Sequence, residues 1–280
     1  MPIIGAHVST NGGLSKCFEN AAAMGAKAIQ IFGSSPQQWF TKMPTAEAIQ
    51  DFTSKKTNAG SPPVYLHAGY LVNLTSPNPI NREKSIKSLA EHYQIAQSLN
   101  AEGLIFHLGS FGEEGHEKGL KNLISGIREV LKKVPGNARL ILENSAGGGN
   151  KLGKTLEELA EIFEGVNSPR AKFCFDTAHA FEAGMIGYES AKKVEEFFNL
   201  WDKKIGIGNI EVLHSNDSKT IFESHNDRHE NIGQGEIGKK GFTNLAKEKR
   251  LHGKVWLLEV PGEDDRGPDK ENIEKLKALF

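Results

Sequence analysis

Eight short apolar segments, each followed by a stretch with helical spacing, constrain the fold of this chain most strongly. They cover residues 3–9, 27–33, 63–69, 103–110, 139–145, 172–179, 210–217 and 254–260. Between them, stretches such as "NREKSIKSLAEHYQIAQSLN" repeat apolar residues three and four positions apart. Strands that alternate with helices are typical of parallel βαβ units, and eight such units close into a barrel. We therefore predict an α/β fold, a single (β/α)8 TIM barrel over residues 1–280, although the pattern alone also fits an open doubly wound sheet.

The composition argues against several classes of protein. The formal net charge is −1, so the charge does not indicate a nucleic-acid binder. No apolar run reaches the ~18–20 residues that cross a bilayer, and the first residues, "MPIIGAHVST", do not resemble an export signal. The two cysteines, Cys17 and Cys174, make no disulfide framework. We expect a cytoplasmic protein without a membrane partner.

Polar side chains stand at the end of nearly every apolar segment. They are His7, Gln30, His67, His107, Glu143, Asp176 with His179, His214 with Asp217, and Glu259. In a barrel these positions converge on the face formed by the C-terminal ends of the strands, where active sites lie. One such histidine alone is better explained as a hydrogen-bonded core residue, and Asp176 is equally well explained as a helix N-cap. Burying so many ionisable groups together is costly unless metal ions compensate, which favours a metal site.

The segment "SHNDRHENIGQGEIG", residues 224–238, adds two further ligand-type residues, Asp227 and His229. In an extended backbone, side chains two positions apart share a face, so both can reach one ion. A ligand set of imidazoles and carboxylates without thiolates suits zinc or manganese in a hydrolytic site.

From "IGAHVS" to "WLLEVPG" the chain resembles the endonuclease IV family of apurinic/apyrimidinic endonucleases. The resemblance is carried by "HAGYLVNL", "FHLGS", "LENSAGGGNKLG", "FDTAHAFEAG", "LHSND" and "DRHENIGQGEIG", in matching order and spacing. It implies a DNA-repair enzyme that hydrolyses the phosphodiester 5′ to an abasic site in duplex DNA, leaving a 3′-hydroxyl and a 5′-deoxyribose phosphate. It also implies removal of 3′-blocking groups. We expect a monomer that is associated with the nucleoid when it acts on DNA.

The resemblance further implies a trinuclear zinc site, with manganese as an alternative at one position. His67 and His107 would bind the first ion, and Glu143 would bridge it to the second. Asp176, His214 and Glu259 would complete the ligands of the second ion. His179, Asp227 and His229 would hold the third. Glu143 would orient or deprotonate the nucleophile.

The resemblance also points to residues that contact DNA. Tyr70 and Leu71 follow His67 at the tip of its loop, where they would fill the gap left by an extruded abasic nucleotide. The alternative is that both pack into the core of their own loop. Gln37, in "SSPQQWF", stands where many relatives carry an arginine that enters the minor groove. Basic residues could hold the flanking DNA backbone, although solvated surface is the simpler interpretation for each: Lys151, Lys154, Lys219 and Arg228.

Two motifs and two other protein classes compete with this interpretation. Residues 148–155, "GGNKLGKT", match the phosphate-loop pattern, and "GQGEIG", residues 233–238, matches a dinucleotide-binding pattern. A nucleotide-binding protein leaves the histidines at the strand ends unexplained. A metal-dependent sugar isomerase or epimerase with the same barrel, and a DNA-binding module without turnover, stay open.

The remaining histidines receive simpler interpretations. His7 is expected to form hydrogen bonds within the barrel mouth, behind the ligands. Four others are expected at the surface, on helices or loops: His92, His116, His225 and His252.

Overall fold

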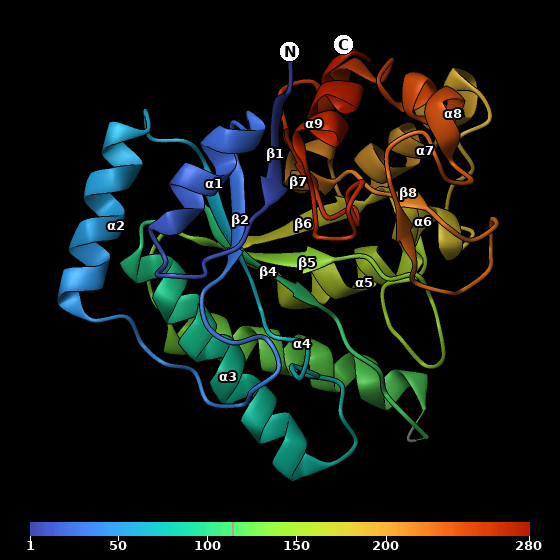
Figure 1. Cartoon of the computed structure of the whole chain (residues 1–280). Helices are drawn as coiled ribbons and strands as arrows, with labels where there is room; N and C mark the ends of the chain where they lie inside the picture. Colours follow the sequence, from blue (N-terminus) through green and yellow to red (C-terminus); the bar gives the residue numbers. More distant parts are fainter. Residues whose placement is uncertain (114) are drawn as a thin grey trace.

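The computed structural model describes residues 1–113 and 115–280, and in this part of the chain eight parallel strands close into a barrel surrounded by helices (Figure 1). The barrel strands are β1 (Ile3–His7), β2 (Ile29–Phe32), β3 (Val64–His67), β4 (Gly103–His107), β5 (Arg139–Glu143), β6 (Ala171–Asp176), β7 (Ile210–His214) and β10 (Val255–Leu258). β1 pairs with both β2 and β10, which closes the barrel. The predicted (β/α)8 fold is confirmed, and the sheet is not open.

The helices that cover the barrel follow its strands in sequence. They are α1 (Lys16–Met24), α2 (Ala46–Asn58), α3 (Pro79–Ser98), α4 (His116–Lys133), α5 (Leu156–Val166), α6 (Thr177–Glu182), α7 (Ala191–Lys204), α8 (Gly238–Leu245) and α9 (Lys270–Lys277), with 3-10 turns η1 (Ile207–Asn209) and η2 (Lys249–Leu251). A short antiparallel ribbon, β8 (Asp217–Ser218) with β9 (His229–Glu230), stands outside the barrel. α9 packs against β1, and both chain ends lie at the same side of the molecule in Figure 1.

Several helices begin at residues that cap them. The side chains of Thr45, Asn78, Thr155, Ser190 and Asp269 each accept a hydrogen bond from a backbone N–H in the first turn of the following helix. Such caps satisfy N–H groups that have no partner inside the helix. The helix starts are therefore encoded locally.

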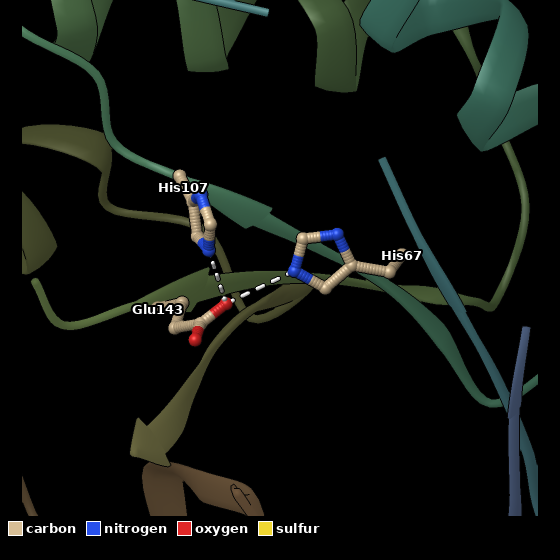
Figure 2. A group of neighbouring side chains, drawn as sticks. All are labelled: His67, His107 and Glu143. Carbon is tan, nitrogen blue, oxygen red and sulfur yellow. Dashed lines mark hydrogen bonds and ion pairs between the residues drawn. The ribbon is translucent and has the colours of Figure 1, made fainter. Parts of the chain in front are cut away.

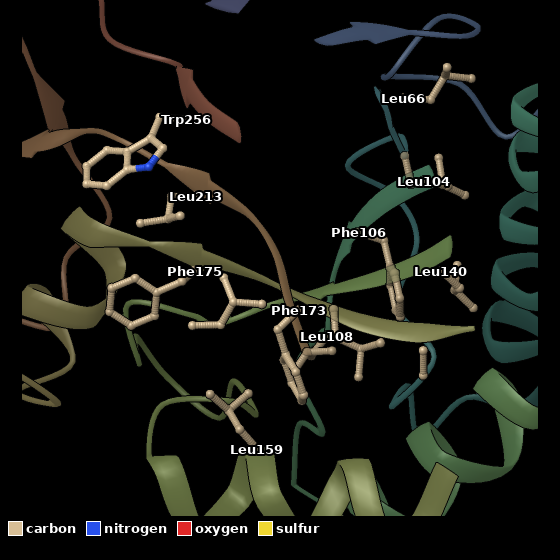
Figure 3. Close-up of a cluster of buried hydrophobic side chains, with 14 of the residues drawn as sticks. Leu66, Leu104, Phe106, Leu108, Leu140, Leu159, Phe173, Phe175, Leu213 and Trp256 are labelled. Atoms are coloured by element: carbon tan, nitrogen blue, oxygen red, sulfur yellow. The ribbon is translucent and has the colours of Figure 1, made fainter. Parts of the chain in front are cut away.

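The strands divide their side chains between two apolar layers. Figure 3 shows the outer layer, in which residues such as Phe106, Phe173 and Trp256 pack between strands and helices. A separate cluster fills the barrel interior: Ala28, Tyr65, Ile105, Ile141, Cys174, Val212, Val255 and Leu257. Because side chains alternate along a strand, the residue two positions further faces the same interior. Those next positions carry Gln30, His67, His107, Glu143, Asp176, His214 and Glu259. A polar layer therefore sits directly on an apolar interior.

The expectation that His92 lies at the surface is wrong. α3 buries residues at three- and four-residue spacing, including Leu89, His92 and Ala96, so the imidazole points inward. Neither ring nitrogen has a hydrogen-bond partner among residues 1–113 and 115–280. Burial lowers the pKa of His92 to about 4.

The other three histidines differ in their surroundings. His116 and His225 are exposed, as expected, and His116 pairs with Glu158 at 2.8 Å. His252 is half-buried, and its Nε2–H donates to the carbonyl oxygen of Ala246. Both cysteines are free and buried. None of the helices in the described ranges has the length and apolar character needed to cross a bilayer.

Candidate metal centre

The pairing of the strands brings predicted site residues side by side at one end of the barrel. His107 is paired with Glu143 in the ladder between β4 and β5, and Asp176 with His214 between β6 and β7. Each of these is an inward-facing position at the C-terminal end of its strand. Their side chains therefore converge at the barrel mouth, as a (β/α)8 fold requires.

His67, His107 and Glu143 form the first of three groups of ligand-type side chains. Figure 2 shows both imidazoles pointing at one carboxylate oxygen: the Nε2 atoms of His67 and His107 lie 3.1 and 3.3 Å from Glu143 Oε2. The Nδ1–H of His67 donates to the carbonyl oxygen of Ala68, which leaves Nε2 free to face the group. All three ligand atoms lie within 4.8 Å of one another, a spacing that one ion could occupy.

Glu143 also belongs to a second group, through its other oxygen. His214 Nδ1 lies 3.0 Å from Glu143 Oε1 and 3.1 Å from Glu259 Oε2. Asp176 Oδ2 is 3.8 Å from the same nitrogen. Because its two oxygens face two different groups, the fully buried Glu143 has the geometry of a bridging ligand.

The third group combines His179 of α6 with residues at β9. His179 Nε2 lies 3.2 Å from Asp227 Oδ1, and His229 Nε2 lies 3.8 Å from both Asp227 Oδ1 and Asp176 Oδ2. His229 Nε2 is buried and has no hydrogen-bond partner in the described part of the chain. A metal ion would satisfy this nitrogen.

The N-cap and the metal-ligand interpretations of Asp176 are compatible with each other. Its Oδ1 accepts the backbone N–H of His179 at 2.8 Å, so it is the N-cap of α6. Its Oδ2 faces the second and third groups, and Asp176 is a member of each. One carboxylate thus starts the helix that carries His179 and also faces the centre.

The charges of the three groups are tightly coupled. Burial alone would raise the pKa of Glu143, but the imidazoles of His214 and His107 hold it well below its usual value. Burial would lower the pKa of His179, but Asp176 and Asp227 raise it well above its usual value. The groups therefore favour ionised carboxylates around a positive charge. Divalent ions fit this demand, and the imidazole and carboxylate donors suit zinc or manganese.

Gln30 is a site residue whose role the sequence did not indicate. It is fully buried, its Nε2 donates to Glu259 Oε1 at 2.5 Å, and its Oε1 accepts the Nε2–H of His214 at 2.7 Å. This contact leaves His214 Nδ1 to face the ligand groups. His7 Nδ1 lies 2.9 Å from Gln30 Nε2, so His7 forms its hydrogen bond within the barrel mouth, as expected.

Two asparagines next to ligands lock the strand ends together. The side-chain amide of Asn144 donates to the backbone carbonyl oxygen of Asp176 and accepts the backbone N–H of the same residue. The backbone carbonyl oxygen of Asn144 accepts the Nδ1–H of His179. Asn216 donates to Asp176 Oδ2 and accepts the backbone N–H of Glu259. The only sequence signal is their position directly after strand ends, in "LEN" and "HSN", where exposed backbone groups need partners.

Asp217 ends the "HSND" motif, but its carboxylate belongs to none of the three ligand groups and is enclosed by the glycine-rich segment instead. It accepts backbone N–H groups from Ser218, Gly233, Gly235, Ile237 and Gly238. A Cβ at position 235 would lie 2.2 Å from the carbonyl oxygen of Ser218, so glycine is required there. The "GQGEIG" pattern thus encloses an anion of this chain, not a dinucleotide.

Glu182, at the end of α6, holds the loop that carries Asp227 and His229. Its Oε1 accepts the Ser218 hydroxyl at 2.7 Å and the Arg228 backbone N–H at 3.2 Å. Burial raises the pKa of Glu182 to about 6. Glu182 lies within "FDTAHAFEAG", but nothing in that motif indicated this role.

The "GGNKLGKT" segment is also occupied by the chain itself. The backbone N–H groups of Gly153 and Lys154 both donate to Glu158 Oε2. A Cβ at position 148 would lie 2.7 Å from the carbonyl oxygen of His225, so this loop packs against the loop before Asp227. These contacts remove amides that a nucleotide phosphate would need.

The residues predicted to contact DNA lie at the rim of the site. Tyr70 and Leu71 are 60% and 39% exposed, so the alternative that both pack into the core of their loop is wrong. The backbone N–H of Tyr70 donates to the carbonyl oxygen of Pro36, which places exposed Gln37 on the adjacent loop. Tyr70 also lines a cavity of about 580 Å³ together with members of the first and third groups.

The chain is similar over its full length to proteins described as probable endonuclease 4. One from Halothermothrix orenii is 36% identical over 276 residues, which cover 98% of this chain and 99% of the relative. One from Nitrosopumilus maritimus is 37% identical over 282 residues, 99% of each chain. A family model described as xylose isomerase-like TIM barrel matches residues 18–279.

Solved structures show the same similarity. The crystal structure of endonuclease IV from Thermus thermophilus has a TM-score of 0.86 and 31% identity, covering 99% of this chain and 98% of that one. A D-tagatose 3-epimerase-like protein has a TM-score of 0.71 at 22% identity, covering 99% of this chain and 94% of that one, which shows a shared fold.

Proposed function

Because the chain belongs to the endonuclease IV family of apurinic/apyrimidinic endonucleases, we propose that it hydrolyses the phosphodiester 5′ to abasic sites in duplex DNA with three zinc ions. Family membership makes it a DNA endonuclease, a hydrolase that acts in DNA repair. The proposed products are a 3′-hydroxyl and a 5′-deoxyribose phosphate, and removal of 3′-blocking groups is a related activity. A DNA substrate puts this activity at the nucleoid.

The observation that carries the proposal is the way Glu143 joins the ligand groups. Its two oxygens face separate sets of imidazoles, so a pair of ions would be held by one buried carboxylate. The third group shares Asp176 with the second, which supports three ions in one connected cluster. Ions bound there would supply Lewis-acid charge that activates water and stabilises the attacking and leaving oxygens.

In the proposed reaction, the chain's own residues position the reacting groups. The ligands of the first ion would be His67, His107 and Glu143; of the second, Glu143, Asp176, His214 and Glu259; of the third, Asp176, His179, Asp227 and His229. Glu143 would orient or deprotonate the attacking water. Gln30 and Asn216 would keep Glu259 and Asp176 in place.

The DNA would be opened at the lesion by the paired loops at the rim. The exposed side chains of Tyr70 and Leu71 would occupy the gap left by the extruded nucleotide, beside Gln37. Tyr70→Ala should weaken binding to abasic duplex by ~1–3 kcal/mol, the scale of a lost stacking contact. The loss should be smaller for a substrate whose lesion lies at a flexible strand end. An equal loss on both substrates would mean that Tyr70 supports the site and does not fill the gap in the DNA.

The direct experiment is a turnover assay of the zinc-loaded protein on a duplex with one abasic analogue. We expect a single incision with a 3′-hydroxyl terminus, and elemental analysis should find about three zinc ions per chain. A pentose substrate tests the epimerase alternative under the same conditions. Pentose conversion without incision would reject the proposal.

A further inference from the structure

A second, smaller cavity of about 260 Å³ adjoins the ligand groups, between the loops that follow β3, β4 and β5. His107, His179 and Asp227 line this cavity and also the main one. Tyr70 lines both as well. A strand whose scissile phosphate lies at these ligand groups would therefore have room for neighbouring groups on two sides.

The two cavities differ in chemistry. Beyond the ligands, the main cavity is lined by apolar residues such as Phe32, Val260 and Pro261. The small cavity also has apolar lining, from Val72 and Leu108, but it contains in addition the polar side chains of Ser110, Ser145 and Lys151. An apolar wall suits a sugar, whereas hydroxyls and an ammonium group suit an anion.

Lys151 supplies the ammonium group of the small cavity, which Asp227 also lines, and the backbone position of Lys151 is fixed by the fold. Its Nζ lies 3.6 Å from Asp227 Oδ2, on the side away from the oxygen that faces His179 and His229. Its backbone forms a β-bridge with Ser110. On either side, Phe111 N–H donates to the carbonyl of Asn150 and Leu152 N–H to that of Gly109. The backbone around Lys151 is therefore fixed beside the ligand groups by these hydrogen bonds, and Lys151 does not stand on a free loop.

Ser145 provides an independent sign of a ligand. Its side chain is 8% exposed, it lines the cavity, and its hydroxyl has no hydrogen-bond partner within residues 1–113 and 115–280. A buried hydroxyl without a partner is costly, and an anionic oxygen in the cavity would satisfy it.

We propose that the small cavity binds a phosphate adjacent to the scissile one in the substrate strand, with the Lys151 ammonium and the Ser145 hydroxyl as donors. This subsite rests on the proposed DNA-cleaving function. The lysine is not the one that the phosphate-loop pattern indicates. That residue, Lys154, gives its backbone N–H to Glu158 and is not among the described residues that line the cavity. The two lysines therefore form a matched pair for a test.

The test measures binding of the zinc-loaded protein to a nicked product duplex, which is not cleaved further. Each phosphate flanking the nick is replaced in turn by an uncharged methylphosphonate. One replacement should weaken wild-type binding by about tenfold, the scale of a charge-assisted contact. For Lys151→Met the same replacement should have a much smaller effect, limited to the part that Ser145 retains, and the slope of log K against log salt should fall by about 1. Lys154→Met should behave as wild type, and Ser145→Ala should reduce the methylphosphonate effect in part.

Two results would overturn the subsite. If Lys151→Met lowers the zinc content and weakens phosphate and methylphosphonate duplexes equally, the lysine only steadies Asp227. If no position shows a methylphosphonate effect, but Lys151→Met removes binding of inorganic phosphate, the cavity holds a free anion and not the strand. Normal incision by wild type in either case would leave the proposed function standing, whereas absence of incision and binding would end both.

Discussion

The candidate metal centre is built from two regions of different construction. In the first, the ends of β3 to β7 supply His67, His107, Glu143, Asp176 and His214, whose positions follow from strand pairing. In the second, Asp227 and His229 come from a loop and ribbon outside the barrel sheet. The first region has its supports within the barrel, in Gln30, Asn144 and Asn216. The second needs its own supports, which Asp217 and Glu182 provide.

The two regions also differ in the backbone that carries their ligands. The strand-borne ligands stand on the paired barrel sheet, whereas Asp227 stands on a loop. Side-chain exposure does not separate them, since His107 is 41% and Asp227 36% exposed. Loops with fewer buried contacts open at lower free energy than core strands. We therefore expect the loop-borne ligands to release their ion before the strand-borne ligands do.

The largest effect should come from the residue that unites the strand-borne ligands. Glu143→Gln keeps the shape but removes the bridging charge, so turnover on abasic duplex should fall by ~10²–10⁴. DNA binding should survive better than cleavage. A single-turnover assay beside a binding titration separates the two, and near-normal cleavage would reject the assigned role.

The next largest effect should come from Asp217, which supports only the loop. Asp217→Asn places an amide –NH2 against backbone N–H groups that now donate to a carboxylate. Affinity for one ion, that of the third group, should fall by roughly 10–100-fold, the range for lost outer-shell partners. Zinc content measured against increasing chelator should show one ion leaving early. Simultaneous release of all ions would mean that the two regions act as one unit.

Gln30→Leu is the matching change on the strand side. It removes the contacts to Glu259 and His214 without touching the loop. Affinity at the second group should fall by about tenfold, near the lower end of outer-shell effects. The same chelator titration should leave the early-released ion of wild type unchanged. A selective loss of that ion in this variant would contradict the division into two regions.

The smallest effect should come from His92, which is buried on α3 outside the barrel strands. Burial lowers the pKa of His92 from its ordinary value of 6.5 to about 4, so the folded state takes up this proton less readily than the unfolded chain. This contribution to stability is fully present above pH 6.5 and is lost as the pH falls toward 4. Metal-free wild type should lose ~1 kcal/mol between about pH 7 and about pH 5.5 from this residue. His92→Leu should remove that component of the pH dependence in urea unfolding, and an unchanged pH profile would mean that His92 is not buried in its neutral form.

Sequence reasoning predicted the barrel because the alternation of strands and helices is a local pattern. It also predicted which strand-end residues converge, since a (β/α)8 fold brings the C-terminal strand ends together whatever the details. His92 was missed although its spacing from Leu89 and Ala96 on a helix was visible. The polarity of histidine suggested a surface position, although its place in the apolar pattern of the helix indicated burial.

The sequence by itself determined the strands, the polar residues at their ends and the pairing of Asp227 with His229 on one face of their segment. It did so because spacing along the chain sets which side chains share a face. Only the tertiary structure decided that Asp217 anchors the "GQGEIG" segment, that Gln30 orients His214, and that Lys151 rather than Lys154 faces the centre. Each of these depends on contacts between segments far apart in sequence. A carboxylate, an amide or a lysine takes its role from the donors and acceptors that packing brings to it, and linear spacing does not specify those partners.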